Sequence, residues 1–170
     1  DAINTAISES AIVFADRSSA SLATSVQASL MAHTDGDDLL DDILSVNLLD
    51  GGAGNDILIG RNGGDVYRFG AGYGSDKIFE DTFGGNDTVA FGAGVAFSDL
   101  TFERTGDRWQ TLRIRLGADS LEISDQFSSD TSRVEKFTFA NGANLGASTI
   151  AAYAKNGADG LNRQIGFDYQ

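Results

Sequence analysis

Apolar and polar positions follow three different patterns along the chain. In the first, Leu22, Val26 and Leu30 recur at every fourth position, which is the spacing of one face of a helix. This pattern predicts a helix over about 17–32. The surrounding residues are poor in glycine and rich in alanine and serine, so we take 1–34 as a helical N-terminal segment.

A period of two characterises the other end of the chain. The segments 112–116, 121–123 and 137–139 each alternate large apolar side chains with polar ones, which is typical of short strands buried on one face. We expect them to be antiparallel, with turns at 105–107 and 117–119 where glycine and aspartate are found together.

A short helix is predicted after the last of these strands. Asn141-Gly142 is a turn signal that ends the strand, and Ser148 is a residue type that caps helix N-termini. Asn156-Gly157 is a typical helix stop. We therefore predict a helix from Ser148 to Lys155 and take 93–170 as a β-rich capping region.

A repeat occupies the region between, residues 35–92. Residues 51–59 fit the nonapeptide G-G-x-G-x-D-x-U-x at every specified position, U being a large apolar residue. Counted from Asp56, the aspartate recurs nine residues later at Asp65 and eighteen residues earlier at Asp38. The pattern continues at Asp76 and Asp87 with a spacing of eleven, which indicates a two-residue insertion in each turn.

Each nonapeptide predicts a turn followed by a very short strand, so that two repeats form one coil of a flattened solenoid. The apolar residues at the U position are then expected to stack inward: Leu40, Leu49, Leu58, Tyr67, Ile78 and Val89. The predicted fold is mainly β, a right-handed parallel β-roll with an N-terminal helix and a β-rich C-terminal cap.

The turns of such a coil carry the candidate chemistry. Glycine permits the positive φ of a tight turn and lets main-chain carbonyls point at one spot, while the aspartate adds charge. Carbonyl and carboxylate oxygens are the ligands that Ca²⁺ prefers, six to eight of them at about 2.3–2.6 Å. The predicted ligand positions are Asp35, Gly36, Asp38, Gly51, Ala53, Gly54, Asp56, Gly60, Asn62, Gly63, Asp65, Tyr73, Gly74, Asp76, Gly85 and Asp87.

Loops on one side of the coil are two repeats apart, which sets the expected neighbours. Asp38 should face Asp56, Asp56 should face Asp76, and Asp65 should face Asp87. This arrangement predicts about three Ca²⁺ ions. The repeat at 42–50 has no glycine, so we expect no ion at its loop. Stacked like charges repel without a cation, and we expect calcium to fold these repeats.

Charge and composition narrow the class of partner. The chain has 25 acidic and 12 basic residues, a formal charge of −13, which argues against nucleic acid and favours cations. It has no cysteine or proline and no apolar run near the roughly 18 residues of a membrane helix. Its start does not read as a cleavable signal peptide, and we expect a piece of a longer protein.

Catalysis is not predicted. Adjacent carboxylates such as Asp37-Asp38 and Asp41-Asp42 could be imagined as the acid and base of a glycosidase. A neighbouring calcium ion would keep them ionised, the opposite of what a general acid needs.

At 33–91 the sequence resembles the repeats-in-toxin (RTX) family of secreted bacterial proteins, with their haemolysin-type calcium-binding repeats. The segments 95–104, 121–127 and 133–142 look like the β-rich flank that commonly follows such repeats. Residues 65–74 are similar to the terminal repeat block of adenylate cyclase toxins.

The resemblance implies a secreted protein, exported by a type I secretion machinery through the parent chain. It implies repeats that are unfolded in calcium-poor cytoplasm and that fold in calcium-rich medium, with a flank that caps the coil. Two alternatives stay open: a structural segment of a surface adhesin or layer protein, and an accessory segment of a secreted protease, lipase or epimerase.

Overall fold

The computed structural model describes residues 11–13, 19–21, 34–41, 48–128 and 132–156. The chain divides into two compact units, 1–32 and 33–170. The domain boundaries predicted above stay predictions.

In the first unit, strand β1 (Ala11–Val13) pairs antiparallel with β2 (Ser19–Ser21). The helix predicted over 17–32 is therefore wrong at Ser19–Ser21, and the rest of that range lies outside the described residues. The helical spacing begins only at Leu22, whereas Ile12 and Val13 of β1 are β-branched residues that favour strand pairing.

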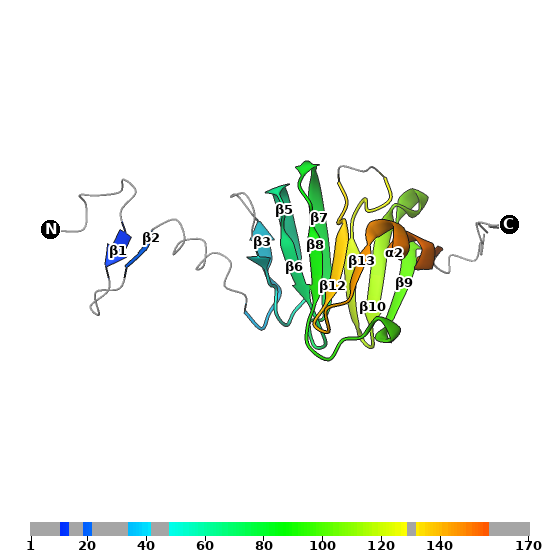
Figure 1. Ribbon diagram of the computed structural model, residues 1–170, viewed down its shortest axis with the longest axis horizontal. Coiled ribbons are helices and arrows are strands. Elements are labelled where there is room, and N and C mark those ends of the chain that lie inside the picture. Colours follow the sequence, from blue (N-terminus) through cyan, green and yellow to red (C-terminus); the bar gives the residue numbers. More distant parts are fainter. Residues whose placement is uncertain (1–10, 14–18, 22–33, 42–47, 129–131, 157–170) are drawn as a thin grey trace. The chain divides into compact units, whose positions relative to one another are not determined.

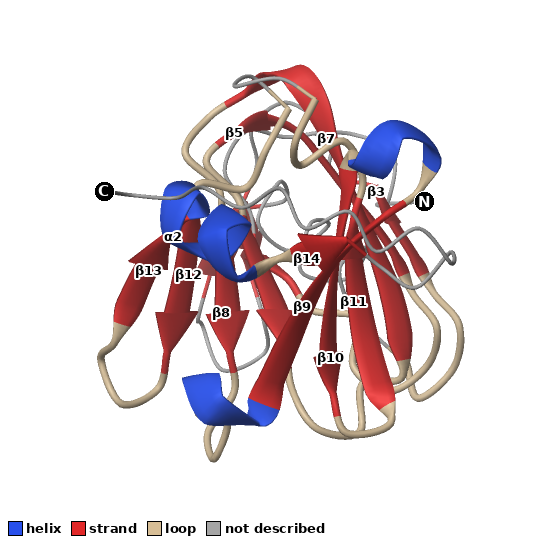
Figure 2. Cartoon of the chain, turned by 90° about the vertical axis from the view of Figure 1, so that its right-hand side faces the viewer, coloured by secondary structure: helices blue, strands red, loops and turns tan. Residues whose placement is uncertain are grey.

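The second unit is mainly β and contains two mixed sheets (Figure 1). The larger has the order β14 (Lys155–Asn156), β9 (Leu100–Thr105), β10 (Thr111–Leu116), β11 (Asp119–Ile123), β7 (Ser75–Gly84), β5 (Ile57–Gly63) and β3 (Leu39–Asp41). The smaller has the order β13 (Asn144–Gly146), β12 (Lys136–Phe139), β8 (Thr88–Phe91), β6 (Val66–Phe69) and β4 (Leu48–Leu49). Figure 2 shows them as two layers, with β8, β12 and β13 in one and β9, β10 and β11 in the other.

From β3 to β8 the chain changes sheet with every strand. Strands two apart in sequence pair in parallel, with Leu40 beside Leu58 and Leu58 beside Ile78 in one sheet. In the other sheet Leu49 lies beside Tyr67, and Tyr67 beside Val89. The predicted inward stack is confirmed, because all six side chains are at most 3% exposed. Each sheet thus contributes one row of buried apolar residues to the core.

Strand length departs from the prediction in two places. Strands β5 and β7 have seven and ten residues, not the very short strands expected of every repeat. Their pairing shifts register between Ile59 and Arg61 and again between Arg61 and Gly63. The two extra residues between Asp76 and Asp87 lengthen strand β7 instead of widening its turn. Bulges in the pairing of β5 with β7 accommodate the difference in length between the two strands.

The capping region extends both sheets. Strands β9, β10 and β11 form an antiparallel meander, as the alternation at 112–123 predicted. Strand β11 then pairs in parallel with β7, and β12 pairs in parallel with β8 and antiparallel with β13. The expectation of antiparallel strands is therefore incomplete, since a period of two reports a buried face and not the direction of the partner strand.

The helix α2 (Ala147–Tyr153) follows β13 with Gly146 at its N-cap and Ile150 fully buried. The predicted helix is present, but Ser148 lies in its first turn and Lys155 lies in β14, which pairs with β9. Two 3₁₀ turns, Phe97–Asp99 and Asp107–Trp109, flank β9. None of the helices in the described parts of the chain has the length and apolar character to cross a membrane.

Candidate metal centre

Aspartates of alternate repeats form a first stack, column one (Asp38, Asp56 and Asp76). The backbone amide of Asp38 donates to Oδ1 of Asp56 at 2.8 Å, and the amide of Asp56 donates to Oδ1 of Asp76 at 3.0 Å. Asp56 and Asp76 are each 1% exposed. The predicted neighbours are thus correct, and each carboxylate lies beneath the preceding loop of its column.

A second stack, column two (Asp65, Asp87 and Glu135), repeats this geometry on the other sheet. The amide of Asp65 donates to Oδ1 of Asp87 at 2.8 Å, and the amide of Asp87 donates to Oε2 of Glu135 at 2.8 Å. Lys136 pairs with Thr88, so Glu135 occupies the aspartate position of the next layer. The sequence did not reveal this role, because the segment before Glu135 contains neither the glycines nor the aspartate of the repeat.

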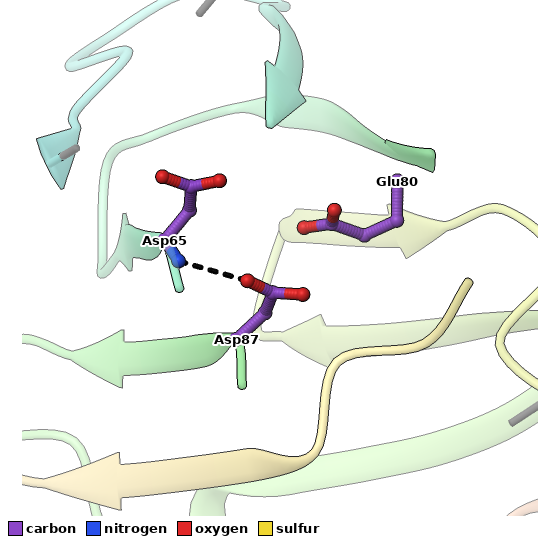
Figure 3. Close-up of side chains that lie close together, drawn as sticks. All are labelled: Asp65, Glu80 and Asp87. Carbon is purple, nitrogen blue, oxygen red and sulfur yellow. Dashed lines mark hydrogen bonds between the residues drawn. The ribbon is translucent and has the colours of Figure 1, made fainter. Parts of the chain in front are cut away.

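Glu80 joins column two from strand β7 (Figure 3). One carboxylate oxygen from each of Asp65, Glu80 and Asp87 lies within 4.8 Å of the other two. The hydroxyl of Tyr67 donates to Oε1 of Glu80. Three carboxyl groups therefore share one small region, with a phenol holding the third in place.

The local sequence explains how Glu80 reaches this position. Glu80 is paired with Arg61 in the irregular stretch of the β5–β7 ladder. A Cβ on Gly60 would overlap the Tyr67 hydroxyl and lie 2.9 Å from Oε1 of Glu80, so the missing side chain of Gly60 makes room for both. Glu80 occupies the position of the first glycine of the repeat. An acidic residue at that position, next to the two-residue insertion, is the sequence signal that could have identified Glu80 as a candidate ligand.

Burial makes these carboxyl groups hard to ionise without a cation. Burial raises the pKa of Glu80 to about 8, with the charges of Asp87 and Asp65 adding to the effect. Burial likewise raises the pKa of Asp76 to about 7, and Asp56 and Asp119 contribute. The pKa of Asp87 is raised to about 6, again first by burial and then by Glu135.

The glycines of column one allow its loops to lie in contact. Gly74 has φ of 89°, and a Cβ there would overlap the carbonyl oxygen of Gly54. A Cβ on Gly51 would lie 2.7 Å from Cγ of Asp56. The amide of Gly54 donates to the carbonyl of Tyr73 at 3.1 Å. The predicted carbonyl ligands of Gly54 and Tyr73 thus lie at the contact between the loops.

A polar ladder runs beside column one at the preceding position of each repeat. The amide of Asn55 donates to Oδ1 of Asp37 at 2.8 Å, and the amide of Ser75 donates to Oδ1 of Asn55 at 3.2 Å. At the next layer Asp119 accepts from the amides of Gly72 and Gly74 at 2.8 and 2.9 Å. Asp119 was not among the predicted residues, since its role follows from the continuation of the sheet through β11.

The remaining predicted positions range from exposed to buried. The carboxylate of Asp38 accepts from the amide of Thr34 at 2.6 Å, and the hydroxyl of Tyr73 donates to Asp50 at 3.0 Å. The other predicted positions divide into three groups: exposed Asp35, Gly36, Asn62 and Gly85, half-buried Ala53 and Gly63, and buried Gly51 and Gly60. The loop before Leu48, where no ion was expected, lies outside the described residues.

The donor set fits a hard cation. Every side chain of the two columns offers carboxylate oxygen, which suits Ca²⁺ and Mg²⁺ and not the softer transition metals. In the part of the chain that the structure describes, the buried oxygens Oδ2 of Asp76 and Oε2 of Glu80 have no hydrogen-bond partner. A buried carboxylate oxygen without a hydrogen-bond donor lowers the stability of the fold, and a bound cation would supply the missing interaction partner.

Residues 111–149 match the family model of the haemolysin-type calcium binding protein related domain. The match extends from β10 into α2 and covers less than half of the chain. It lies outside the repeats at 35–92, so it supports a calcium-binding family of the RTX kind on residues other than the stacked aspartates. No curated protein matches the chain.

Proposed function

We propose that this chain is a calcium-binding module in which Ca²⁺ ions lie between the stacked loops of columns one and two. In this proposal the repeats form a right-handed parallel β-roll and the capping region closes its end. The observation that carries the proposal is the pair of aspartate stacks, in which buried carboxylates of successive layers lie in register and bring their charges together.

Calcium suits this arrangement better than magnesium does. The two stacks combine carboxylates with loop carbonyls whose positions are set by glycine, and such mixed ligands give a flexible geometry. Ca²⁺ accepts six to eight oxygens in such geometry, whereas Mg²⁺ demands a near-ideal octahedron and dehydrates reluctantly. Column two adds Glu80, so that three carboxylates lie close enough to contribute to one site.

Ion binding would be coupled to folding. Ionised Asp65, Glu80 and Asp87 repel one another in a partly desolvated region, and the thin apolar core must offset that repulsion when no cation is present. Binding free energy becomes folding free energy wherever the unfolded chain has no site. We therefore propose calcium-dependent folding as the module's role.

The proposed setting is a secreted bacterial protein of the RTX kind, exported by a type I secretion machinery. The family match in the capping region supports this setting. We propose no catalytic role for the module, because its buried acids form stacks suited to a cation; the activity of the parent protein would reside elsewhere.

The direct test is isothermal titration calorimetry of the chain with CaCl₂ and, separately, with MgCl₂ at the same ionic strength. Saturable heat with calcium and none with millimolar magnesium is expected. Asp107→Asn is a matched control, because Asp107 is exposed in the turn before β10, away from both columns. Equal binding of both ions, or the same loss in Asp107→Asn as in Asp56→Asn, would overturn the proposal.

A further inference from the structure

A cavity of about 260 Å³ lies in the capping region, and its described lining residues include no member of the two columns. Strand β9 contributes Arg104, the turn after β11 contributes Gln126 and Phe127, and Arg133 comes from the segment before β12. Helix α2 contributes Ser148 and Ala151. Among the described residues, two arginines and no carboxylate line this cavity, although the whole chain carries a formal charge of −13.

Arg104 is held in the cavity by an aromatic ring. Its guanidinium carbon lies 3.7 Å from the centroid of Phe127, and the amide of Phe127 donates to the carbonyl of Gln110 at 2.9 Å. Arg104 makes no ion pair with a carboxylate of the described residues, in contrast to Arg113 and Arg115 on the neighbouring strand β10. A preorganised cation without a counter-ion thus lines the cavity.

The segments that carry Gln126 and Arg133 are also fixed. The side chain of Gln126 is 3% exposed, accepts from the amide of Val134 at 2.9 Å and donates to its carbonyl at 2.8 Å. This double hydrogen bond fixes the segment that carries Arg133. Nε of Arg133 lies 3.8 Å from Oε1 of Glu135, so its guanidinium is held near the last carboxylate of column two while it lines the cavity.

From this arrangement we infer that the cavity binds an oxyanion group, a carboxylate or sulfate carried by a small ligand. A planar guanidinium presents paired N–H donors that match the two oxygens of such a group. Stacking on Phe127 orients Arg104, so that little side-chain freedom is lost on binding. The methyl group of Ala151 provides an apolar contact beside the charges, which favours an acid on a short carbon skeleton.

The size of the cavity limits the ligand. Pockets for drug-sized molecules begin at about 300 Å³, so this cavity accepts a single sugar acid or a group of similar size. The site goes beyond calcium binding, since neither column contributes a ligand to it.

The test is a titration of the calcium-loaded, ¹⁵N-labelled chain with sodium glucuronate at constant ionic strength, followed by the NMR signals of the arginine Nε–H groups and the backbone amides. Sodium sulfate tests a free inorganic oxyanion, and glucose tests the sugar without its charge. Saturable shifts of Arg104 and Ser128 are expected with the anions and not with glucose. Stronger binding of glucuronate would identify an organic acid as the ligand, and stronger binding of sulfate an inorganic oxyanion.

Two pairs of variants make the test specific. Arg104→Gln should weaken binding about tenfold or more, whereas Arg115→Gln, which removes the same charge from the next strand, should not. Ala151→Leu fills the cavity without altering any charge and should abolish binding. Ala152→Leu, on the exposed side of the same helix, should bind as the unaltered chain does.

Shifts that grow without saturation, or equal binding by all four variants, would overturn the inference. Because the readout is at Arg104 and not at the columns, failure here would leave calcium binding intact. Conversely, absence of calcium binding would be seen in calorimetry before any anion is added.

Discussion

Columns one and two use the same motif but arrange their charges differently. In column one each aspartate has a polar neighbour in the ladder of Asp37, Asn55 and Ser75, and Asp119 closes the far end by accepting two backbone amides. Column two instead gathers Glu80 with Asp65 and Asp87. Column two therefore concentrates more negative charge in one place than column one does, and a bound cation would balance this charge.

The two columns share the close contact of their loops but differ in the number of acidic side chains that they bring together. Glycine loops come into contact in both columns, since a Cβ on Gly74 would overlap the Gly54 carbonyl and a Cβ on Gly85 would overlap the Gly63 carbonyl. In column two, the long strand β7 and the buried hydroxyl of Tyr67 also position Glu80, so column two differs from column one in its charge.

The largest effect is expected from the aspartate that two proposed sites share. Asp56→Asn should remove two ions from the calorimetric stoichiometry, because Asp56 lies between Asp38 and Asp76; Asp65→Asn should remove one. Each lost site lowers the free energy of unfolding by about 2.7 kcal/mol at calcium concentrations 100-fold above Kd, or about 5 kcal/mol for Asp56→Asn. Urea unfolding in calcium measures this difference, and equal losses from the two variants would contradict the proposed stacking.

A glycine pair tests whether shape governs column one. Gly72 and Gly74 both have positive φ, but a Cβ on Gly72 has no atom within 4 Å while one on Gly74 would overlap the Gly54 carbonyl. Gly72→Ala should cost only the backbone strain, about 1–2 kcal/mol, whereas Gly74→Ala should cost about 3 kcal/mol or more. Urea unfolding of both variants in calcium is the measurement. Indistinguishable stabilities would show that the close approach of the loops is unimportant.

The dependence on pH should reverse with calcium. The raised pKa values of Asp87, Asp76 and Glu80, from about 6 to about 8, mean that the folded apo chain binds protons more tightly than the unfolded chain does. Apo stability should therefore fall by at least about 3 kcal/mol between pH 5 and pH 8. Calcium requires ionised carboxylates, so stability in calcium should rise over the same interval. Parallel pH profiles with and without calcium would contradict this account.

The smallest effect should come from the extra acid of column two. Glu80→Gln should weaken calcium binding in that column about tenfold and raise apo stability slightly at pH 8, because it removes a buried charge. Tyr67→Phe is the matched comparison: it removes the hydroxyl that positions Glu80 but keeps the carboxylate, and should weaken calcium binding less than Glu80→Gln does. If the two variants weakened calcium equally, Glu80 would be a structural partner of Tyr67 and not a ligand.

The recurring aspartate, spaced by nine and then by eleven residues, was enough to predict the neighbours within the two stacks. It placed Asp56 and Asp76 in one stack and Asp65 and Asp87 in the other, and it identified the buried U positions, because turns and strands of fixed length bring every second repeat into register. Insertions kept this register because their extra residues lie in a turn and in the extended strand β7.

The residues that sequence reasoning missed belong to positions where the motif is broken. Glu80 replaces a glycine, and Glu135 and Asp119 lie in strands whose parallel partners are distant in sequence. Hydrophobic alternation could show that β11 and β12 each have a buried face, but not that they extend the stacks. The cavity around Arg104 could not be predicted either, since its lining comes from four segments with no common sequence pattern.

The most direct test of the central claim is residue-resolved hydrogen exchange of the chain at pH 7.5, in calcium and in chelator. The account predicts that chelation removes the protection of amides in β5–β8, including Asp65 and Asp87, before that of the antiparallel β10–β11 pair, where no aspartate column runs between the strands. Unchanged protection of β5–β8 in chelator would contradict the claim that calcium holds the columns together.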